Sequence, residues 1–294
     1  MKNRIIFILT SILLMSHIAH AELSTFRGTS SLGYAKESTK PARTPTPASV
    51  PATPPAKPIK KCIEDANGEL GISAIYNNNL PALKKAVAQG ANVNYRTCDE
   101  WGQTLLMMAA SNARIEMVDF LLQAGANPNL KDFKFGWPAL RYSNINHFSK
   151  IATLLLEAGA NPNQRDNDGE TDLMWAAGFG YAEIVKLLLK YGANSNLKNK
   201  NGHPAMFSAI YRAHSTSVKA LLDGGGNPDI KGVGNFTALM AAASSGYKDI
   251  VKMLLDAGAN PNLVDDDRMT ALQYAKEVGS RDTVGLLMKY GAKR

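Results

Sequence analysis

The chain has 294 residues and a formal net charge of +8, with 33 Lys and Arg against 25 Asp and Glu. Residues 62–294 carry 24 of these basic residues and 23 of the acidic ones, so that part has a net charge of only +1. A nearly neutral domain excludes the basic footprint that nucleic-acid binding requires.

Residues 1–21 predict a secretory signal peptide. Lys2 and Arg4 precede an apolar run over residues 5–18, and small residues at 19–21 offer a cleavage point. No cysteine stands directly after that point, which argues against a lipid anchor. No other apolar run approaches the ~18–20 residues of a membrane-spanning helix. We therefore expect a protein without a membrane span, in the periplasm or outside the cell.

Residues 22–61 predict a disordered linker, because seven of the chain's 14 prolines lie there among Thr, Ala and Lys. Such a composition favours an extended, polyproline-like chain that cannot bury a core. A spacer is the expected role, and a recognition motif is the alternative.

Cys62 and Cys98 are the two cysteines of the chain. In an oxidising compartment they are expected to form a disulfide that fastens the start of the domain and contributes about 2–4 kcal/mol. A reactive thiol is the alternative, but it needs a basic partner that the sequence does not suggest.

A Gly-Ala-Asn motif repeats along the rest of the chain. The steps between its glycines are 35 and 34 residues and then 33, and these glycines are Gly90, Gly125, Gly159, Gly192, Gly225, Gly258 and Gly291. A fixed period near 33 residues predicts one structural unit copied in tandem, which forms a solenoid.

Residues 99–131 illustrate the unit. A turn over 99–102 precedes Thr104, which is placed to cap a short apolar helix over 105–110. A second helix is predicted over 115–123 from apolar residues at helical spacing, and Gly125 is expected to end it.

These units resemble the ankyrin repeat. The family motif Thr-Pro-Leu-His-x-Ala is present as Thr-Leu-Leu-Met-Met-Ala at 104–109 and recurs at 171–176, 237–242 and 270–275. The resemblance implies an all-α solenoid of about seven helix-turn-helix units with short β-hairpin-like turns over residues 62–294. The motif's histidine is replaced by Met107, Met174, Met240, Phe207 and Gln273, so packing is expected to replace its hydrogen bonds.

The sequence contains no recognisable arrangement of catalytic residues. His147, His203 and His214 lack the spacing of a metal site, and no nucleophile or phosphate-binding motif accompanies them. The acidic run at 265–267 lacks the spaced ligands of a calcium loop and is expected to be a solvated turn. We expect no enzyme activity, metal, cofactor or small-molecule substrate.

The resemblance also implies a concave face, lined by the turn tips and the first helix of each unit. Aromatic and arginine side chains on such a face are typical anchors of protein interfaces. The alternative is that some of them pack between neighbouring turns. The candidate partner-binding residues are Trp101, Phe133, Phe135, Trp137, Phe179, His203, Tyr211, Arg212 and Phe236.

A protein partner is therefore expected. The predicted export resembles that of bacterial ankyrin proteins of the self-protection or immunity type, which cap a cell-wall hydrolase such as a D,D-endopeptidase. Two alternatives are an envelope protein that supports an oxidative-stress enzyme such as catalase, and a secreted host-directed effector.

Overall fold

A computed structural model describes residues 65–293. The predicted signal peptide, the predicted linker and Cys62 lie outside these residues. Within them the secondary structure is helical, with two isolated β-bridges, Arg96–Thr104 and Lys231–Thr237, in the connecting loops. This confirms the predicted all-α solenoid with hairpin-like turns.

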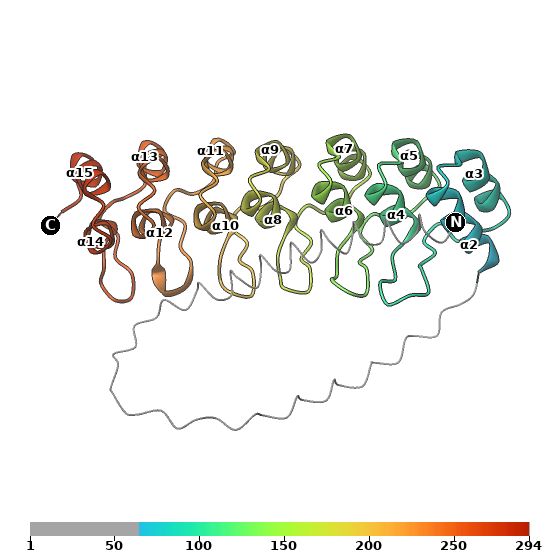
Figure 1. Ribbon diagram of the computed structural model, residues 1–294, viewed down its shortest axis with the longest axis horizontal. Coiled ribbons are helices and arrows are strands. Elements are labelled where there is room, and N and C mark those ends of the chain that lie inside the picture. The colour runs from blue at the N-terminus through green and yellow to red at the C-terminus, as the bar shows by residue number, and fades with distance from the viewer. Residues whose placement is uncertain (1–64, 294) are drawn as a thin grey trace, which may run out of the picture. The chain divides into compact units, whose positions relative to one another are not determined.

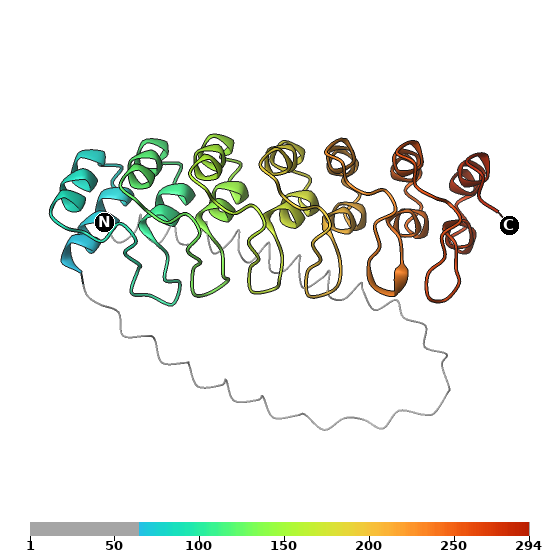
Figure 2. The ribbon, with the colours of Figure 1, turned by 180° about the vertical axis from the view of Figure 1, so that it is seen from behind.

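The helices form seven antiparallel pairs, here called repeats 1–7, which lie side by side in two rows (Figures 1 and 2). The inner row consists of α2 (Ala66–Tyr76), α4 (Leu105–Ser111), α6 (Ala139–Ile145), α8 (Asp172–Gly178), α10 (Ala205–Tyr211), α12 (Ala238–Ser244) and α14 (Ala271–Glu277). The outer row consists of α3 (Leu80–Ala88), α5 (Ile115–Gln123), α7 (Ser149–Glu157), α9 (Ala182–Lys190), α11 (Ser215–Asp223), α13 (Lys248–Asp256) and α15 (Arg281–Lys289).

Threonine caps begin four of the inner helices, as predicted for the first of them. The Oγ1 atom of Thr104 accepts a hydrogen bond from the N–H of Met107 at 3.2 Å, and Thr171, Thr237 and Thr270 form equivalent caps. The Sδ atom of Met107 in turn lies 3.3 Å from the N–H of Thr104. Met107 therefore supplies a weak acceptor as well as the packing expected of it. Gly125 follows α5 with a φ of 88°, which an L side chain rarely adopts.

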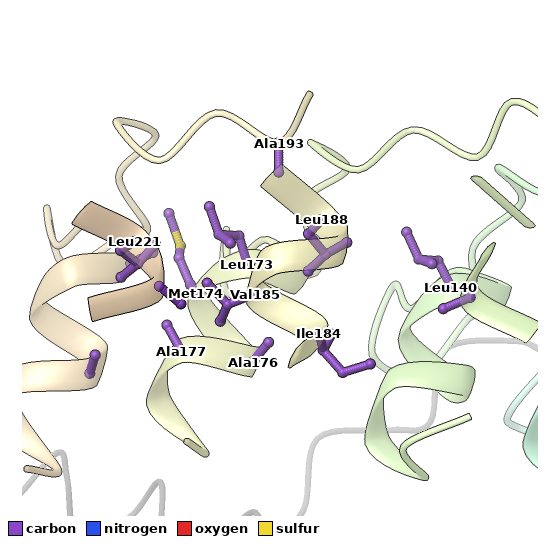
Figure 3. Packing of buried hydrophobic residues seen from close by; sticks show 14 of the residues in the cluster. Leu140, Leu173, Met174, Ala176, Ala177, Ile184, Val185, Leu188, Ala193 and Leu221 are labelled. Atoms are coloured by element: carbon purple, nitrogen blue, oxygen red, sulfur yellow. The ribbon is translucent and has the colours of Figure 1, made fainter. Parts of the chain in front are cut away.

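The core runs unbroken between the two rows. In repeat 4, Leu173, Met174, Ala176 and Ala177 of α8 pack against Ile184, Val185 and Leu188 of α9 (Figure 3). Small alanines let the inner helices approach one another closely, and the outer helices bury one face only. Each repeat therefore buries its apolar surface against its neighbours, as expected of a solenoid.

Side chains two residues after the repeated Gly-Ala-Asn motif join one repeat to the next. The Oδ1 atom of Asn129 accepts a hydrogen bond from the N–H of Asn161 at 2.7 Å, and its Nδ2 donates to the carbonyl of Gly159 at 3.0 Å. The equivalent hydrogen bond is donated by a backbone N–H of the following repeat in four other places. Its acceptors there are the side chains of Asn94, Asn163, Asp229 and Asn262. The motif that reveals the period thus also bonds neighbouring repeats together.

Six finger loops connect each outer helix to the next inner helix and project on one side of the helix rows (Figure 1). They span residues 89–104, 124–138, 158–171, 191–204, 224–237 and 257–270, and are numbered 1–6 in that order. The fifth contains a short 3-10 turn, η1 (Val233–Asn235). Main-chain bonds link some neighbouring tips, as between the N–H of Phe133 and the carbonyl of Trp101 at 2.8 Å.

Two expectations need correction. The sequence predicts that the first repeat begins at Gly71, but Asp65 caps α2 and the helix starts at Ala66. The acidic run at 265–267 is only partly solvated. Asp265 is 7% exposed, because its carboxylate accepts hydrogen bonds from the backbone of its own loop and from the Tyr274 hydroxyl.

Candidate partner-binding surface

The predicted binding residues lie on the finger loops and at the ends of the inner helices, in three clusters. Phe133 is the most exposed, with 55% of its surface accessible, and the other eight are half-buried. Ring-to-ring contacts account for this burial, so the aromatic residues are partly committed to packing within the chain.

The first cluster lies on finger loops 1 and 2. The ring centroids of Trp101 and Phe135 are 5.5 Å apart, and those of Phe135 and Trp137 are 4.6 Å apart. The Lys134 ammonium lies 4.0 Å from the Trp101 ring centroid and pairs with Glu100 at 2.8 Å. A cation above an indole ring stabilises both side chains in place. This cluster is a preformed surface of rings and charges.

Phe133 belongs to the same surface but contacts different residues. Its ring covers Gly102, where an added Cβ would lie 2.0 Å from a ring carbon. The Arg96 guanidinium carbon is 4.8 Å from the ring centroid. Phe133 is thus held from below while more than half of it faces solvent, the geometry expected of an interface anchor.

The second cluster lies near the ends of the inner helices in repeats 4 and 5. Phe179 stacks on Trp175 with 4.2 Å between centroids, and the Arg212 guanidinium carbon lies 4.5 Å from the Phe179 centroid. Trp175, which the sequence places on an inner helix and so predicts to be a core residue, is only 6% exposed. Phe179 and Arg212 therefore form a cation–aromatic pair on a buried tryptophan base.

The third cluster contains His203 and Tyr211, and Phe236 lies on the next finger loop. The ring centroids of His203 and Tyr211 are 5.6 Å apart. The sequence predicts His203 at a turn tip, but it lies at the base of finger loop 4. Burial, followed by the charge of Lys198, lowers the pKa of His203, so the imidazole is neutral at pH 7. Burial raises the pKa of Tyr211 to about 12. Phe236 packs against Tyr274 at 5.2 Å.

Sequence reasoning missed Arg141, which lies between the first two clusters. It occupies the repeat position of Met107 and Met174, is 1% exposed, and forms ion pairs with Asp172 and, at 3.2 Å, with Asp166. Two features of the sequence could have revealed this ion pair. Arg141 is a charged residue at an apolar position of the repeat, and Asp172 is an acid where the motif has proline.

The rings of two tryptophans flank the Arg141 side chain. The guanidinium carbon is 5.7 Å from the Trp137 centroid and 5.8 Å from that of Trp175. Burial raises the pKa of Asp172, and the charge of Arg141 opposes that shift. The buried pair therefore joins repeats 3 and 4 directly beneath the aromatic surface.

Two further predictions concern the cysteines and a membrane span. Cys98 is disulfide-bonded, but Cys62 lies outside the described residues, so the pairing of the two stays a prediction. Along residues 65–293 no helix combines the length and apolar character that crossing a bilayer would take.

The repeats of this chain are similar to those of a known protein family and of several known proteins. The family described as ankyrin repeats (3 copies) matches residues 70–166, 146–232 and 225–293. Arf-GAP with coiled-coil, ANK repeat and PH domain-containing protein 2 of Rattus norvegicus is 34% identical over 79 residues, which are 27% of this chain and 10% of that protein. The corresponding protein 3 of Homo sapiens is 38% identical over 65 residues, 22% of this chain and 8% of that protein.

The match thus spans about a tenth of the length of these curated relatives. Among solved structures, the ankyrin repeat domain of Bcl-3, a member of the IkappaB protein family, is similar with a TM-score of 0.70 and 27% identity. That similarity covers 76% of this chain and all of the Bcl-3 chain. Since the family match extends over more than half of its residues, this chain belongs to the ankyrin-repeat family.

Proposed function

We propose that this chain is an exported, non-enzymatic ankyrin protein that binds and masks another protein. The observation that carries the proposal is the exposed ring of Phe133, held beside Trp101 and Lys134 on finger loops 1 and 2. Ankyrin repeats are protein-interaction modules, and exposed aromatic residues with cations are the usual centres of protein interfaces. Trp101 and Phe135, already ordered by mutual contact, would lose little side-chain freedom on binding.

The partner that we propose is a periplasmic peptidoglycan hydrolase of the D,D-endopeptidase type, which the chain inhibits for self-protection. The support is the predicted signal peptide and the resemblance to exported ankyrin proteins of the immunity type. The mechanism is steric: the finger loops cover the substrate cleft of the hydrolase and exclude the cell wall. No chemical step by this chain is needed.

Support of an oxidative-stress enzyme such as catalase is the second candidate. The chain has 11 methionines, which could serve as oxidisable groups in such a role. Met107 and Met240 are each 1% exposed, however, so these side chains are shielded from oxidants in the folded protein. This burial favours the masking function over the accessory one. A host-directed effector is the third candidate.

The test is capture of partners from a periplasmic extract by the mature chain, residues 22–294, beside its Phe133→Ala variant. Ile115→Ala is the matched control, because Ile115 is 42% exposed on the outer helix α5, away from the finger loops. We expect Phe133→Ala to weaken partner binding by about 2 kcal/mol or more, as for a hot-spot residue, and Ile115→Ala to leave it unchanged.

A second variant, Phe135→Ala with Trp137→Ala, removes the stacked pair and is compared after its thermal unfolding has been measured. Retention of a cell-wall hydrolase, and loss of its wall-digesting activity on adding the chain, would support the proposal. Equal capture by Phe133→Ala and the unmodified chain would refute the surface. Capture of catalase in place of a hydrolase would refute the proposed partner.

A further inference from the structure

One row of stacked side chains, here called the aromatic row, joins the first two clusters of the candidate surface. Its successive steps, measured between ring centroids or from a centroid to a guanidinium carbon, are 5.5, 4.6, 5.7, 5.8, 4.2 and 4.5 Å. In order, its members are Trp101, Phe135, Trp137, Arg141, Trp175, Phe179 and Arg212. All three tryptophans of the chain belong to this row. It runs from finger loop 1 to the end of α10.

Both ends of the aromatic row reach the surface, whereas its middle is buried. Trp101 and Phe135 at one end are half-buried, as are Phe179 and Arg212 at the other. Arg141 in the middle is only 1% exposed. The row therefore connects the two clusters through the interior of the repeats, by way of the Arg141 side chain.

Hydrogen bonds hold the Arg141 guanidinium in one orientation. Its Nε donates to the Asp172 carboxylate, its Nη1 to the Asp166 carboxylate at 3.2 Å, and its Nη2 to the carbonyl of Glu170 at 3.4 Å. Because a guanidinium is planar and rigid, three bonds from three of its nitrogens fix the direction of the whole plane. The two neighbouring tryptophan rings therefore contact a cation that cannot easily turn.

Stability alone does not account for a charged residue at this position. Met107 and Met174 occupy the same position in the neighbouring repeats, and both are buried. Replacing a buried ion pair by apolar residues is often neutral or even stabilising. A methionine side chain is flexible and uncharged, whereas a guanidinium presents a flat cation to an aromatic ring. What Arg141 adds is a fixed orientation for the rings beside it.

The length of the aromatic row indicates the kind of partner that it suits. Finger loop 1 leads into repeat 2 and Arg212 ends the inner helix of repeat 5, so three spacings of ~8–10 Å separate the two ends. A standard protein interface buries ~800 Å² on each partner, a patch about 30 Å across. The two clusters together therefore match the contact face of one folded protein, whereas either cluster alone is smaller than such a face.

We propose that Arg141 is a positioning residue of the partner-binding surface, and that one folded partner contacts both clusters. On one side Arg141 orients Trp137 and, through that ring, the remaining rings of the first cluster. On the other side it orients Trp175 and, through that ring, the pair of Phe179 and Arg212. A single substitution at residue 141 therefore changes both clusters together. This inference rests on the protein-binding part of the proposed function.

The experiment records fluorine NMR spectra of the mature chain labelled with fluorotryptophan. One resonance is expected for each of the three tryptophans, and single Trp→Phe variants assign them. The test variant is Arg141→Met/Asp172→Ala, which removes the cation together with its main counter-charge. Trp137 and Trp175 lie beside residue 141, so their resonances move in any case. Two rings separate Trp101 from residue 141 along the row, so Trp101 is the informative reporter.

We expect the Trp101 resonance of the double variant to lose most of its displacement from the position that it has in the urea-unfolded chain. A purely structural role of Arg141 predicts no such loss, because removing both charges is expected to restore most of the stability. The matched control is Leu254→Ala in α13, three repeats from Arg141. Leu254 is fully buried, so this variant is destabilised without a change in the row. It should leave all three resonances in place.

Binding of the hydrolase that the unmodified chain captures is measured with the same variants. We expect the Arg141→Met/Asp172→Ala variant to bind it about tenfold more weakly, and Phe179→Ala at the far end of the row to do the same. The Leu254→Ala control should bind within about twofold of the unmodified chain. Circular dichroism melts establish that each variant is folded at the temperature of the measurement.

Three results would overturn the positioning role: an unmoved Trp101 resonance in the double variant, the same movement in Leu254→Ala, or full hydrolase binding by the double variant. Unchanged binding by Phe179→Ala would confine the site to the first cluster and refute the joint surface. Failure here is separable from failure of the proposed function. A moved Trp101 resonance in a chain that captures no partner refutes the masking function alone. A weakened Phe133→Ala variant beside an unmoved Trp101 resonance refutes the role of Arg141 alone.

Discussion

Replacing Arg141 with Met tests how the buried ion pair between repeats 3 and 4 contributes to stability. Met already occupies the same repeat position in α4 and α8 as Met107 and Met174, so the change leaves little cavity. It does leave the Asp172 carboxylate, 1% exposed, without its cation. Breaking a buried pair in this way costs about 3–5 kcal/mol, a large fraction of the ~5–15 kcal/mol that holds a domain together.

The companion variant Arg141→Met/Asp172→Ala removes both charges. Alanine stands at the position of Asp172 in α6, α10, α12 and α14, so the double variant reproduces the apolar contact of neighbouring repeats. We expect it to recover most of the stability that the single variant loses, because replacing buried charges by apolar residues is often neutral. A smaller deficit remains, since Asp166 also loses its ion pair with Arg141. The two substitutions should therefore couple by a few kcal/mol.

The assay is urea unfolding followed by circular dichroism and by tryptophan fluorescence. Trp137 and Trp175 flank Arg141, so fluorescence reports this interface while circular dichroism reports all repeats. Both probes are needed because repeat arrays can unfold in parts.

The pH dependence gives a further test of the same mechanism. Burial raises the pKa of Asp172 from 3.8 and Arg141 opposes this, so removal of Arg141 raises that pKa further. A carboxyl group with a raised pKa binds its proton more tightly in the folded state, so stability increases as the pH falls toward 3.8. The deficit of Arg141→Met should shrink between pH 8 and pH 5. A double variant as unstable as the single one, or a deficit that does not change with pH, would refute the reasoning.

Three further substitutions probe other features, each by thermal or urea unfolding. Gly102→Ala should destabilise the fold by ~1–3 kcal/mol, because φ is 57° there and the new Cβ would strike Phe133; a neutral result would contradict the close contact. Asn129→Ala should cost ~1–2 kcal/mol by removing two bonds to the next repeat, whereas Asn167→Ala on an exposed loop tip should cost less. The His203→Gln variant should lose less stability than the unmodified chain as pH falls below 6.5. Burial lowers the pKa of His203, so in the unmodified chain acid must protonate a buried ring at a cost in folding free energy. Parallel stability–pH profiles for the two proteins would contradict this explanation.

Features set by neighbouring residues were readable from the sequence. The helix over Ile115–Gln123 has the predicted bounds, and Thr104 caps the helix predicted to follow it. The caps and positive-φ glycines depend on contacts three or four residues away, and the 33-residue period repeats them. The helical pattern, the number of repeats and the buried methionines follow from such local signals.

The candidate surface depended on contacts that cross from one repeat to the next. Phe135 and Trp137 were correctly placed together, but their mutual stacking, which half-buries them, could not be read from spacing. The burial of Asp265 required a hydroxyl from the following helix.

Arg141 and Asp172 are 31 residues apart, and only the stacking of repeats turns two charged residues into one buried pair. The sequence by itself therefore determined the repeating unit and its order. The tertiary structure decided which side chains remain exposed, because exposure in a solenoid depends on what the neighbouring repeat places against each residue.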